Sequence, residues 1–172
     1  ALLEACVEAE PGKENILLWG DSYAAHLYRG LAASLTPGQT LTQLNASSCP
    51  PEWRTEPASV NSCAAMNELA SSLIAQGRFD VIVVGAFWQD GTLEGLRSSI
   101  QRVQEATDAR VVVVGTPPQW SPSLPRHWSY LEARGMTALP EYAQPTLREE
   151  RAEVDARVRS IAEDEGVEFF DP

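Results

Sequence analysis

Ser22 lies where a short apolar run gives way to a helical pattern. Residues 16–19 read Ile-Leu-Leu-Trp, the run stops at Gly20-Asp21-Ser22, and a helical pattern follows from Tyr23. An apolar run of this length that ends at a glycine predicts a buried strand. A serine after such a strand places its hydroxyl at the carboxyl edge of the sheet, where ligands of open α/β sheets bind. The helix start suits a developing oxyanion, so Ser22 is the first candidate for a nucleophile.

A structural interpretation of the same residues stands beside the catalytic one. Aspartate and serine are common helix N-caps, and a cap contributes about 1 kcal/mol. Spacing alone favours neither interpretation. In both, we expect Asp21 to brace the loop through hydrogen bonds rather than to titrate in catalysis.

A serine hydroxyl attacks a carbonyl only when a neighbouring base removes its proton. The sequence holds two histidines, His26 and His127. His26 follows Ser22 by one helical turn and would point along the helix, which favours a surface or capping role. His127 lies in a long connection that could reach the site, but an aromatic contact within that connection is the stronger interpretation. Both are weak candidates for the base.

Alternating strand and helix patterns indicate how these residues are positioned. Strands are predicted near residues 15–19, 40–44, 80–86, 110–114 and 167–170. Helices are predicted over residues 23–34 and 64–75, around residues 93–103, and from about residue 154 to the stop at Gly166. Five strands interleaved with helices predict one α/β domain with a parallel, doubly wound sheet. A length of 172 residues suits a single domain with a full core.

Composition excludes several classes of function. The formal charge of −11 opposes phosphate binding, so nucleic acid is not an expected partner. No apolar run approaches the roughly 18 residues of a membrane span, and the first residues lack the form of a signal peptide. With two histidines and no paired CxxC spacing, a zinc site is not expected.

Cys49 and Cys63 flank a loop that is rich in proline and polar residues. A disulfide across a loop of that size would contribute about 3 kcal/mol and would fit an oxidising compartment such as the periplasm. The alternative is that these two cysteines and Cys6 are three unrelated buried thiols. If the disulfide forms, Cys6 is the odd cysteine, with a partner beyond the present sequence.

Four segments of the chain resemble the SGNH (GDSL-like) hydrolase superfamily, and more narrowly the SGNH domain fused to membrane acyltransferase-3 proteins. Those proteins O-acetylate cell-envelope polysaccharides. The segments are residues 16–31 around Ser22, Ser48-Cys49-Pro50-Pro51 with Cys63 downstream, residues 81–88 ending in Trp88, and residues 111–118 ending in Pro117-Pro118. They cover most of the chain in the family's order. The resemblance implies a three-layer domain with a flavodoxin-like five-stranded parallel sheet.

The family's base comes from an Asp-x-x-His motif near the end of the domain, and this sequence contains no such motif. The chain ends at Asp171-Pro172, which resembles the strand that precedes the motif. We therefore expect residues 1–172 to form an SGNH-like domain that is truncated before this segment. Two alternatives stay open: another residue serves as the base, or the domain is inactive.

The resemblance also implies an oxyanion hole with several donors. The first is the Ser22 N–H. The family's second block supplies a glycine N–H where this chain has Ala46-Ser47-Ser48, which makes Ser48 the expected second donor. The asparagine of the wider superfamily's third block is replaced here by the segment from Gly85 to Trp88, and the acyltransferase-linked group shares the tryptophan. Gly85 would allow close backbone approach, or serve only as a turn residue.

The expected function is transfer of an acyl group, acetyl above all, through an acyl-serine to hydroxyls of a cell-envelope polysaccharide. No cofactor is required. The resemblance implies a fused membrane acyltransferase as partner and a periplasmic or extracellular location, tethered to the inner membrane. One alternative is a secreted carbohydrate or lipid esterase of the same fold. The other is a non-catalytic glycan-binding or scaffolding module. A phosphate-binding domain ranks last, because Gly20 alone is no phosphate loop.

The connection over residues 116–145 carries six prolines and several aromatic residues, including Trp120, Trp128 and Tyr130. We expect an irregular but packed segment that forms a lid or an acceptor-binding wall, because it leaves the fourth strand at the ligand-binding edge. Ordinary packing of the loop aromatics is an equal alternative.

Overall fold

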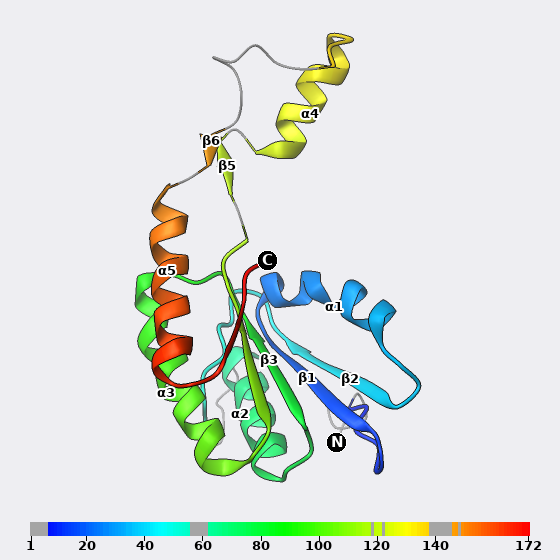
Figure 1. Ribbon diagram of the computed structural model, residues 1–172, viewed down its shortest axis with the longest axis vertical. Helices are drawn as coiled ribbons and strands as arrows, with labels where there is room; N and C mark the ends of the chain where they lie inside the picture. Colours follow the sequence, from blue (N-terminus) through cyan, green and yellow to red (C-terminus); the bar gives the residue numbers. More distant parts are fainter. Residues whose placement is uncertain (1–6, 56–61, 118, 122, 138–145, 148) are drawn as a thin grey trace.

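A computed structural model describes residues 7–55, 62–117, 119–121, 123–137, 146–147 and 149–172 of the chain. Its centre is a five-stranded parallel sheet (Figure 1). The strands are β1 (Glu14–Gly20), β2 (Gln39–Asn45), β3 (Val81–Gly85), β4 (Arg110–Val114) and β7 (Glu168–Phe170), and their spatial order is β2-β1-β3-β4-β7. This is the flavodoxin-like order of a doubly wound sheet, so the predicted fold class is confirmed.

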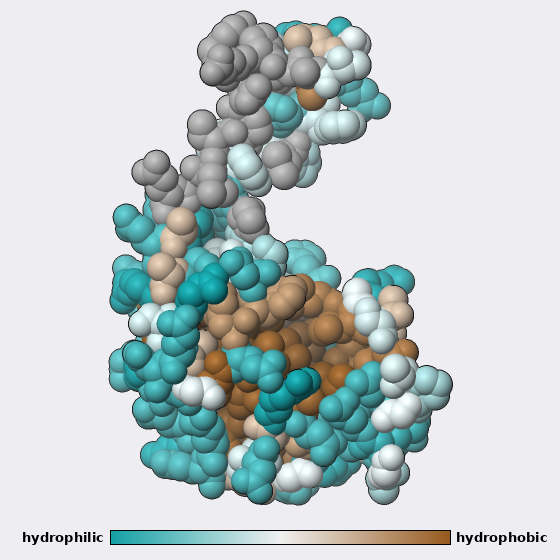
Figure 2. Space-filling view, in the orientation of Figure 1, coloured by the Kyte–Doolittle hydropathy of each residue, from teal (hydrophilic) through white to brown (hydrophobic). Residues whose placement is uncertain are grey.

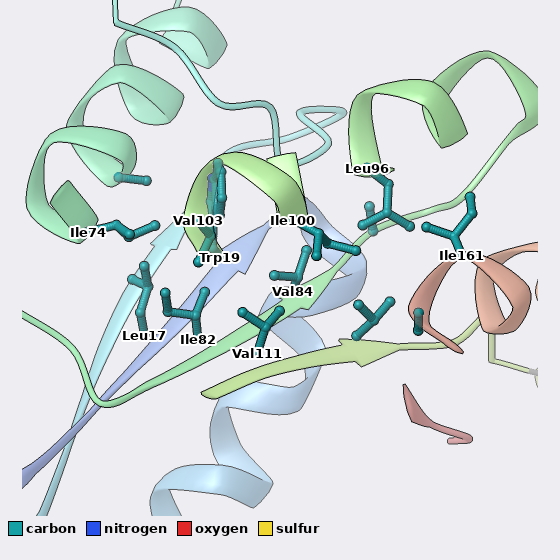
Figure 3. Close-up of a cluster of buried hydrophobic side chains, with 14 of the residues drawn as sticks. Leu17, Trp19, Ile74, Ile82, Val84, Leu96, Ile100, Val103, Val111 and Ile161 are labelled. Atoms are coloured by element: carbon teal, nitrogen blue, oxygen red, sulfur yellow. The ribbon is translucent and has the colours of Figure 1, made fainter. Parts of the chain in front are cut away.

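Four helices flank the sheet: α1 (Ser22–Ser34), α2 (Ser62–Ala75), α3 (Asp90–Ala106) and α5 (Glu149–Asp164). One sheet face packs against α2, α3 and α5. Figure 3 shows side chains such as Trp19, Ile82 and Val111 of the strands gathered with Ile74, Leu96 and Ile161 of these helices. The apolar spacing of α3, with Leu93, Leu96, Ile100 and Val103 all buried, follows the predicted helical face.

The opposite sheet face is covered less fully. Its apolar cluster includes Leu18 of β1, Leu41 of β2 and Val83 of β3, and within the described chain the only helix that contributes side chains to it is α1. Hydrophobic atoms remain visible over this face in Figure 2, between the hydrophilic surfaces of α1 and α5.

The connection between β4 and α5 corrects the expectation of an irregular packed segment. It contains two short antiparallel strands, β5 (Trp120–Ser121) and β6 (Thr146–Leu147), and the helix α4 (Leu124–Ala133). Figure 1 shows α4 at the outer end of an arm that points away from the sheet. The prolines did not exclude a helix here, because Pro125 occupies its first turn, where a missing N–H is tolerated.

The aromatic residues of α4 do not pack as expected either. Trp128 and Tyr130 are exposed, at 69% and 46%, and the guanidinium of Arg134 lies 3.8 Å from the centre of the Tyr130 ring. The base of the connection reaches the edge of the sheet at Gln119, whose side-chain amide donates to the Tyr23 hydroxyl at 3.2 Å. None of the described helices is long and apolar enough to cross a bilayer.

Candidate active site

Ser22 is the first residue of α1 and is exposed at the carboxyl edge of the sheet. The chain turns there through Gly20, whose φ is +150°. A Cβ at this position would lie 1.8 Å from the Gly85 carbonyl oxygen, so glycine is required. The ends of β1 and β3 thereby approach closely, and the Asp21 N–H donates to the Gly85 carbonyl at 3.4 Å. Gly20, rather than Gly85, is the residue at which close backbone approach demands glycine.

The buried Asp21 carboxylate is the N-cap of α1 and also holds a second loop. One oxygen accepts from the Tyr23 N–H at 2.8 Å, and the other accepts from the Phe87 N–H at 2.9 Å. Asp21 is 4% exposed. With each oxygen bound to a backbone donor, this side chain braces the loop that carries Ser22 against the loop after β3.

Ser48 lies in the loop that follows β2. That loop is tied to β1, because the Ala46 N–H donates to the Gly20 carbonyl at 3.2 Å. Ser48 adopts a left-handed φ of 52°, which is uncommon for a residue other than glycine. Ser22 and Ser48 line one pocket of about 350 Å³, together with Asp21, Tyr23, Pro50, Phe87, Gln89 and Thr92. We call it the Ser22 pocket.

A disulfide and a hydrogen-bonded asparagine also hold the Ser48 loop. Cys49 and Cys63 form a disulfide, as predicted. The buried Asn67 of α2 accepts from the Trp19 indole N–H at 2.7 Å and donates to the Pro50 carbonyl at 3.0 Å. Asn67 thereby connects β1 to the loop that carries Ser48. Cys6, the expected odd cysteine, lies outside the described residues.

Trp88 and Gly85 do not line the Ser22 pocket. Trp88 is fully buried, and its indole N–H donates to the Val114 carbonyl at 2.8 Å, which places it in the core beneath the site. Gly85 ends β3 and lines a separate, apolar pocket of about 180 Å³. That pocket also includes Tyr23, His26 and Pro172.

Neither histidine lines the Ser22 pocket. His26 is exposed and meets the Tyr23 ring edge-on, with 6.2 Å between ring centres. His127 belongs to α4, at the outer end of the arm in Figure 1. Asp21 carries the only carboxylate among the described residues that line the pocket, and both of its oxygens accept hydrogen bonds from backbone N–H groups.

Sequence reasoning missed several residues of the site. Phe87 forms part of its wall and packs on Tyr23 with ring centres 4.9 Å apart. Arg151 of α5 lies on the other side of Phe87, with its guanidinium carbon 4.2 Å from the ring centre. The position of Phe87 could have been predicted from the sequence. Successive side chains of an extended segment point to opposite sides, so a Trp88 side chain in the core implies that the Phe87 side chain points away from the core. No local signal connects Arg151 to this loop.

The chain resembles known proteins over its whole length. The family model described as "SGNH domain (fused to AT3 domains)" matches residues 1–172. No curated protein matches the chain. Among solved structures, the periplasmic domain of a lipopolysaccharide acetyltransferase from Salmonella ser. Paratyphi A is similar, with a TM-score of 0.74 and 22% sequence identity over 99% of this chain and 69% of that one. The family match confirms the resemblance of the sequence motifs, and the structural likeness supports the fold.

Proposed function

The chain belongs to the family of SGNH domains fused to AT3 domains, and from this membership we propose that Ser22 transfers an acyl group, acetyl above all, to a hydroxyl of a cell-envelope polysaccharide. The observation that carries the proposal is the position of Ser22, which is exposed at a helix N-terminus and lines the same pocket as Ser48. The family as such supports a function of the acyltransferase or esterase type. The acceptor, the acyl group and the residue roles are our proposal.

The reaction proceeds in two halves. The Ser22 Oγ attacks the acyl carbonyl carbon while a base takes its proton, and the N–H groups of Ser22 and Ser48 bind the tetrahedral oxyanion. The intermediate collapses to an acyl-serine, and the departing alkoxide takes the proton back from the base. An acceptor hydroxyl then gives its proton to the base and attacks the acyl-serine carbonyl carbon. The second tetrahedral intermediate collapses to the new ester, and the departing Ser22 Oγ takes the proton back from the base. The Ser22 N–H is suited to its role because the first N–H groups of a helix have no intrahelical acceptor.

We place the base in an Asp-x-x-His segment that follows residue 172. Two observations support this position. Neither His26 nor His127 lines the Ser22 pocket. Pro172 lines the apolar pocket beside Tyr23, so a segment continuing from it starts at the same edge of the sheet as Ser22.

The proposed location is the periplasm, with the domain tethered to the inner membrane through a fused acyltransferase domain. The disulfide between Cys49 and Cys63 fits an oxidising compartment. The similar structure is named as a periplasmic domain of a lipopolysaccharide acetyltransferase, which agrees with this location and with a glycan acceptor.

A serine-reactive fluorophosphonate probe tests the nucleophile in the protein extended past residue 172. We expect the label on Ser22, its loss in Ser22→Ala, and its retention in the control Ser98→Ala, which alters an exposed serine of α3. Turnover should fall roughly 10³-fold or more in Ser22→Ala. Labelling that persists in Ser22→Ala would overturn the assignment, and no labelling of the extended protein would support the non-catalytic glycan-binding module.

Product analysis separates the transferase from the esterase. With an acetyl donor and an oligosaccharide acceptor, a transferase yields acetylated oligosaccharide, which mass spectrometry detects as an added acetyl mass. An esterase releases acetate at the same rate with and without the acceptor. Both reactions use the same residues, so only the products distinguish them.

A further inference from the structure

Three adjoining pockets, lined by both polar and apolar side chains, lead from the Ser22 pocket to the flank of α3 and α5, and we call them together the groove. We propose that this groove binds an extended, uncharged polysaccharide chain and presents one of its hydroxyls to Ser22. The proposal rests on the function proposed above, and it assigns a binding site and a ligand class: a neutral polyhydroxylated polymer rather than a small ester or a polyanion.

Three pockets make up the groove, and each shares wall residues with the next. The Ser22 pocket shares Phe87 and Gln89 with a central pocket of about 510 Å³. The central pocket shares Asp90 and Arg157 with a far pocket of about 390 Å³. Figure 1 shows the two helices that form its walls, α3 and α5, side by side. Because the pockets adjoin in series, an elongated ligand can occupy all three.

The size of the groove exceeds what a simple acyl ester needs. Ligand pockets of small molecules span roughly 300–1,000 Å³, so the Ser22 pocket by itself is large enough for an acetyl group and its immediate carrier. The central and far pockets then stay available for the rest of a longer acceptor.

The walls of the central and far pockets carry paired donors and acceptors. The lining carboxylates are Asp90, Glu94, Glu150 and Glu153, and the lining guanidiniums are Arg97, Arg151 and Arg157. The amides of Gln89 and Gln119 add one donor and one acceptor group each. Such side chains suit sugar hydroxyls, which both donate and accept. The near balance of charge in a chain with a formal charge of −11 favours a neutral ligand.

Arg151 links the groove to the wall of the Ser22 pocket. Its guanidinium donates to the Trp88 carbonyl at 2.9 Å and stacks on the Phe87 ring. Its Nε is buried, and in the described part of the chain this donor has no acceptor. A buried donor without a partner is costly, and a ligand hydroxyl in the central pocket would supply the missing acceptor.

Ion pairs hold the walls in place before a ligand binds. Arg157 of α5 pairs with Asp90 of α3 at 2.5 Å, at the boundary between the central and far pockets. Arg97 of α3 pairs with Asp164 at 2.9 Å and Glu165 at 2.5 Å, and these hydrogen bonds raise the pKa of Arg97 above its ordinary value. The groove is therefore largely formed in the free protein, which lowers the cost of binding.

The test compares two double variants that remove the same charges. Arg157→Gln/Glu94→Gln alters the groove. Arg102→Gln/Glu105→Gln alters an exposed ion pair of α3 that lines none of the three pockets. The binding of neutral gluco-, manno-, galacto- and xylo-hexasaccharides, and of their monosaccharides, is measured by calorimetry on the wild-type chain and on both variants. A galacturonate hexamer is the anionic comparison.

We expect at least one neutral hexasaccharide to bind about tenfold more tightly than its monosaccharide and more tightly than the galacturonate hexamer. The affinity of the groove variant for this hexasaccharide should fall about tenfold, as expected for the loss of one hydrogen bond to a charged group. The affinity of the control variant should not change. The proposal is overturned if no neutral hexasaccharide shows this gain, if the galacturonate hexamer binds most tightly, or if both variants bind equally. Labelling of Ser22 is independent of this result, so failure of the groove and failure of the nucleophile are distinguishable.

Discussion

The Asp21 carboxylate accepts a hydrogen bond from the Phe87 N–H at 2.9 Å, across 66 residues of sequence. This contact joins the turn that presents Ser22 to the loop whose Phe87 ring forms a wall of the Ser22 pocket. The same carboxylate caps α1 through Tyr23. One side chain therefore sets both the start of the helix and the position of the neighbouring wall.

Replacing Asp21 by alanine should destabilise the domain by about 2–4 kcal/mol, because both an N-cap and a buried hydrogen bond to a carboxylate are lost. Asp21→Asn should recover only part of this, since its amide oxygen can replace one acceptor while its NH₂ group faces a donor. Urea denaturation of the three proteins measures the difference. An Asp21→Ala protein within about 0.5 kcal/mol of the wild type would contradict the bracing role.

Gly20→Ala should destabilise the domain by more than about 4 kcal/mol, because its Cβ would overlap the Gly85 carbonyl oxygen at 1.8 Å. Gly30→Ala, in the following helix α1, is the matched control. A Cβ at Gly30 meets nothing within 4 Å, and the change should stabilise α1 by about 0.5–1 kcal/mol. Thermal melts of both variants test the pair, and similar melting temperatures would disprove the close approach of β1 and β3.

Trp19 and Asn67 should show coupled energetics. Each of Trp19→Phe and Asn67→Leu leaves the partner's buried polar group without its hydrogen bond, whereas the double variant removes both groups. We expect the double variant to cost about 1–2 kcal/mol less than the sum of the single changes. Denaturant unfolding of the three variants gives this coupling energy. Additivity within 0.3 kcal/mol would mean that the bond contributes nothing.

Removing the disulfide should cost about 3 kcal/mol, as expected for a cross-link between residues separated by 14 positions. The Cys49→Ser/Cys63→Ser variant, compared with the wild type under oxidising conditions, measures this cost by denaturant unfolding. Reduction of the wild type should then bring the two proteins to the same stability. A variant as stable as the oxidised wild type would show that the hydrogen bonds of Ala46 and Asn67 hold the Ser48 loop without the disulfide.

Most of the strand positions follow from local pattern. The run that becomes β3 is apolar throughout, and the run that becomes β4 is apolar after the exposed Arg110, because parallel strands with helices on both faces are buried on both sides. The observed strand boundaries differ from the predicted ones by about one residue, for example Gln39–Asn45 where residues 40–44 were predicted. The helix α4 was not predicted, because the prolines of this connection favour irregular structure, although Pro125 is tolerated in the first turn of a helix.

The turn at Gly20-Asp21-Ser22 and the alternation of strand and helix were determined by the sequence alone, since each depends on neighbours a few residues apart. The sequence left two alternatives for the cysteines, and the structure decided for the disulfide between Cys49 and Cys63. Strand order and contacts between distant loops were decided only by the tertiary structure. Asp21 meets Phe87, and Arg151 reaches the same loop from α5, because the parallel sheet brings their elements together at one edge. A buried strand or helix face produces a periodic pattern of apolar residues in the sequence, whereas a contact between two distant loops produces no sequence pattern.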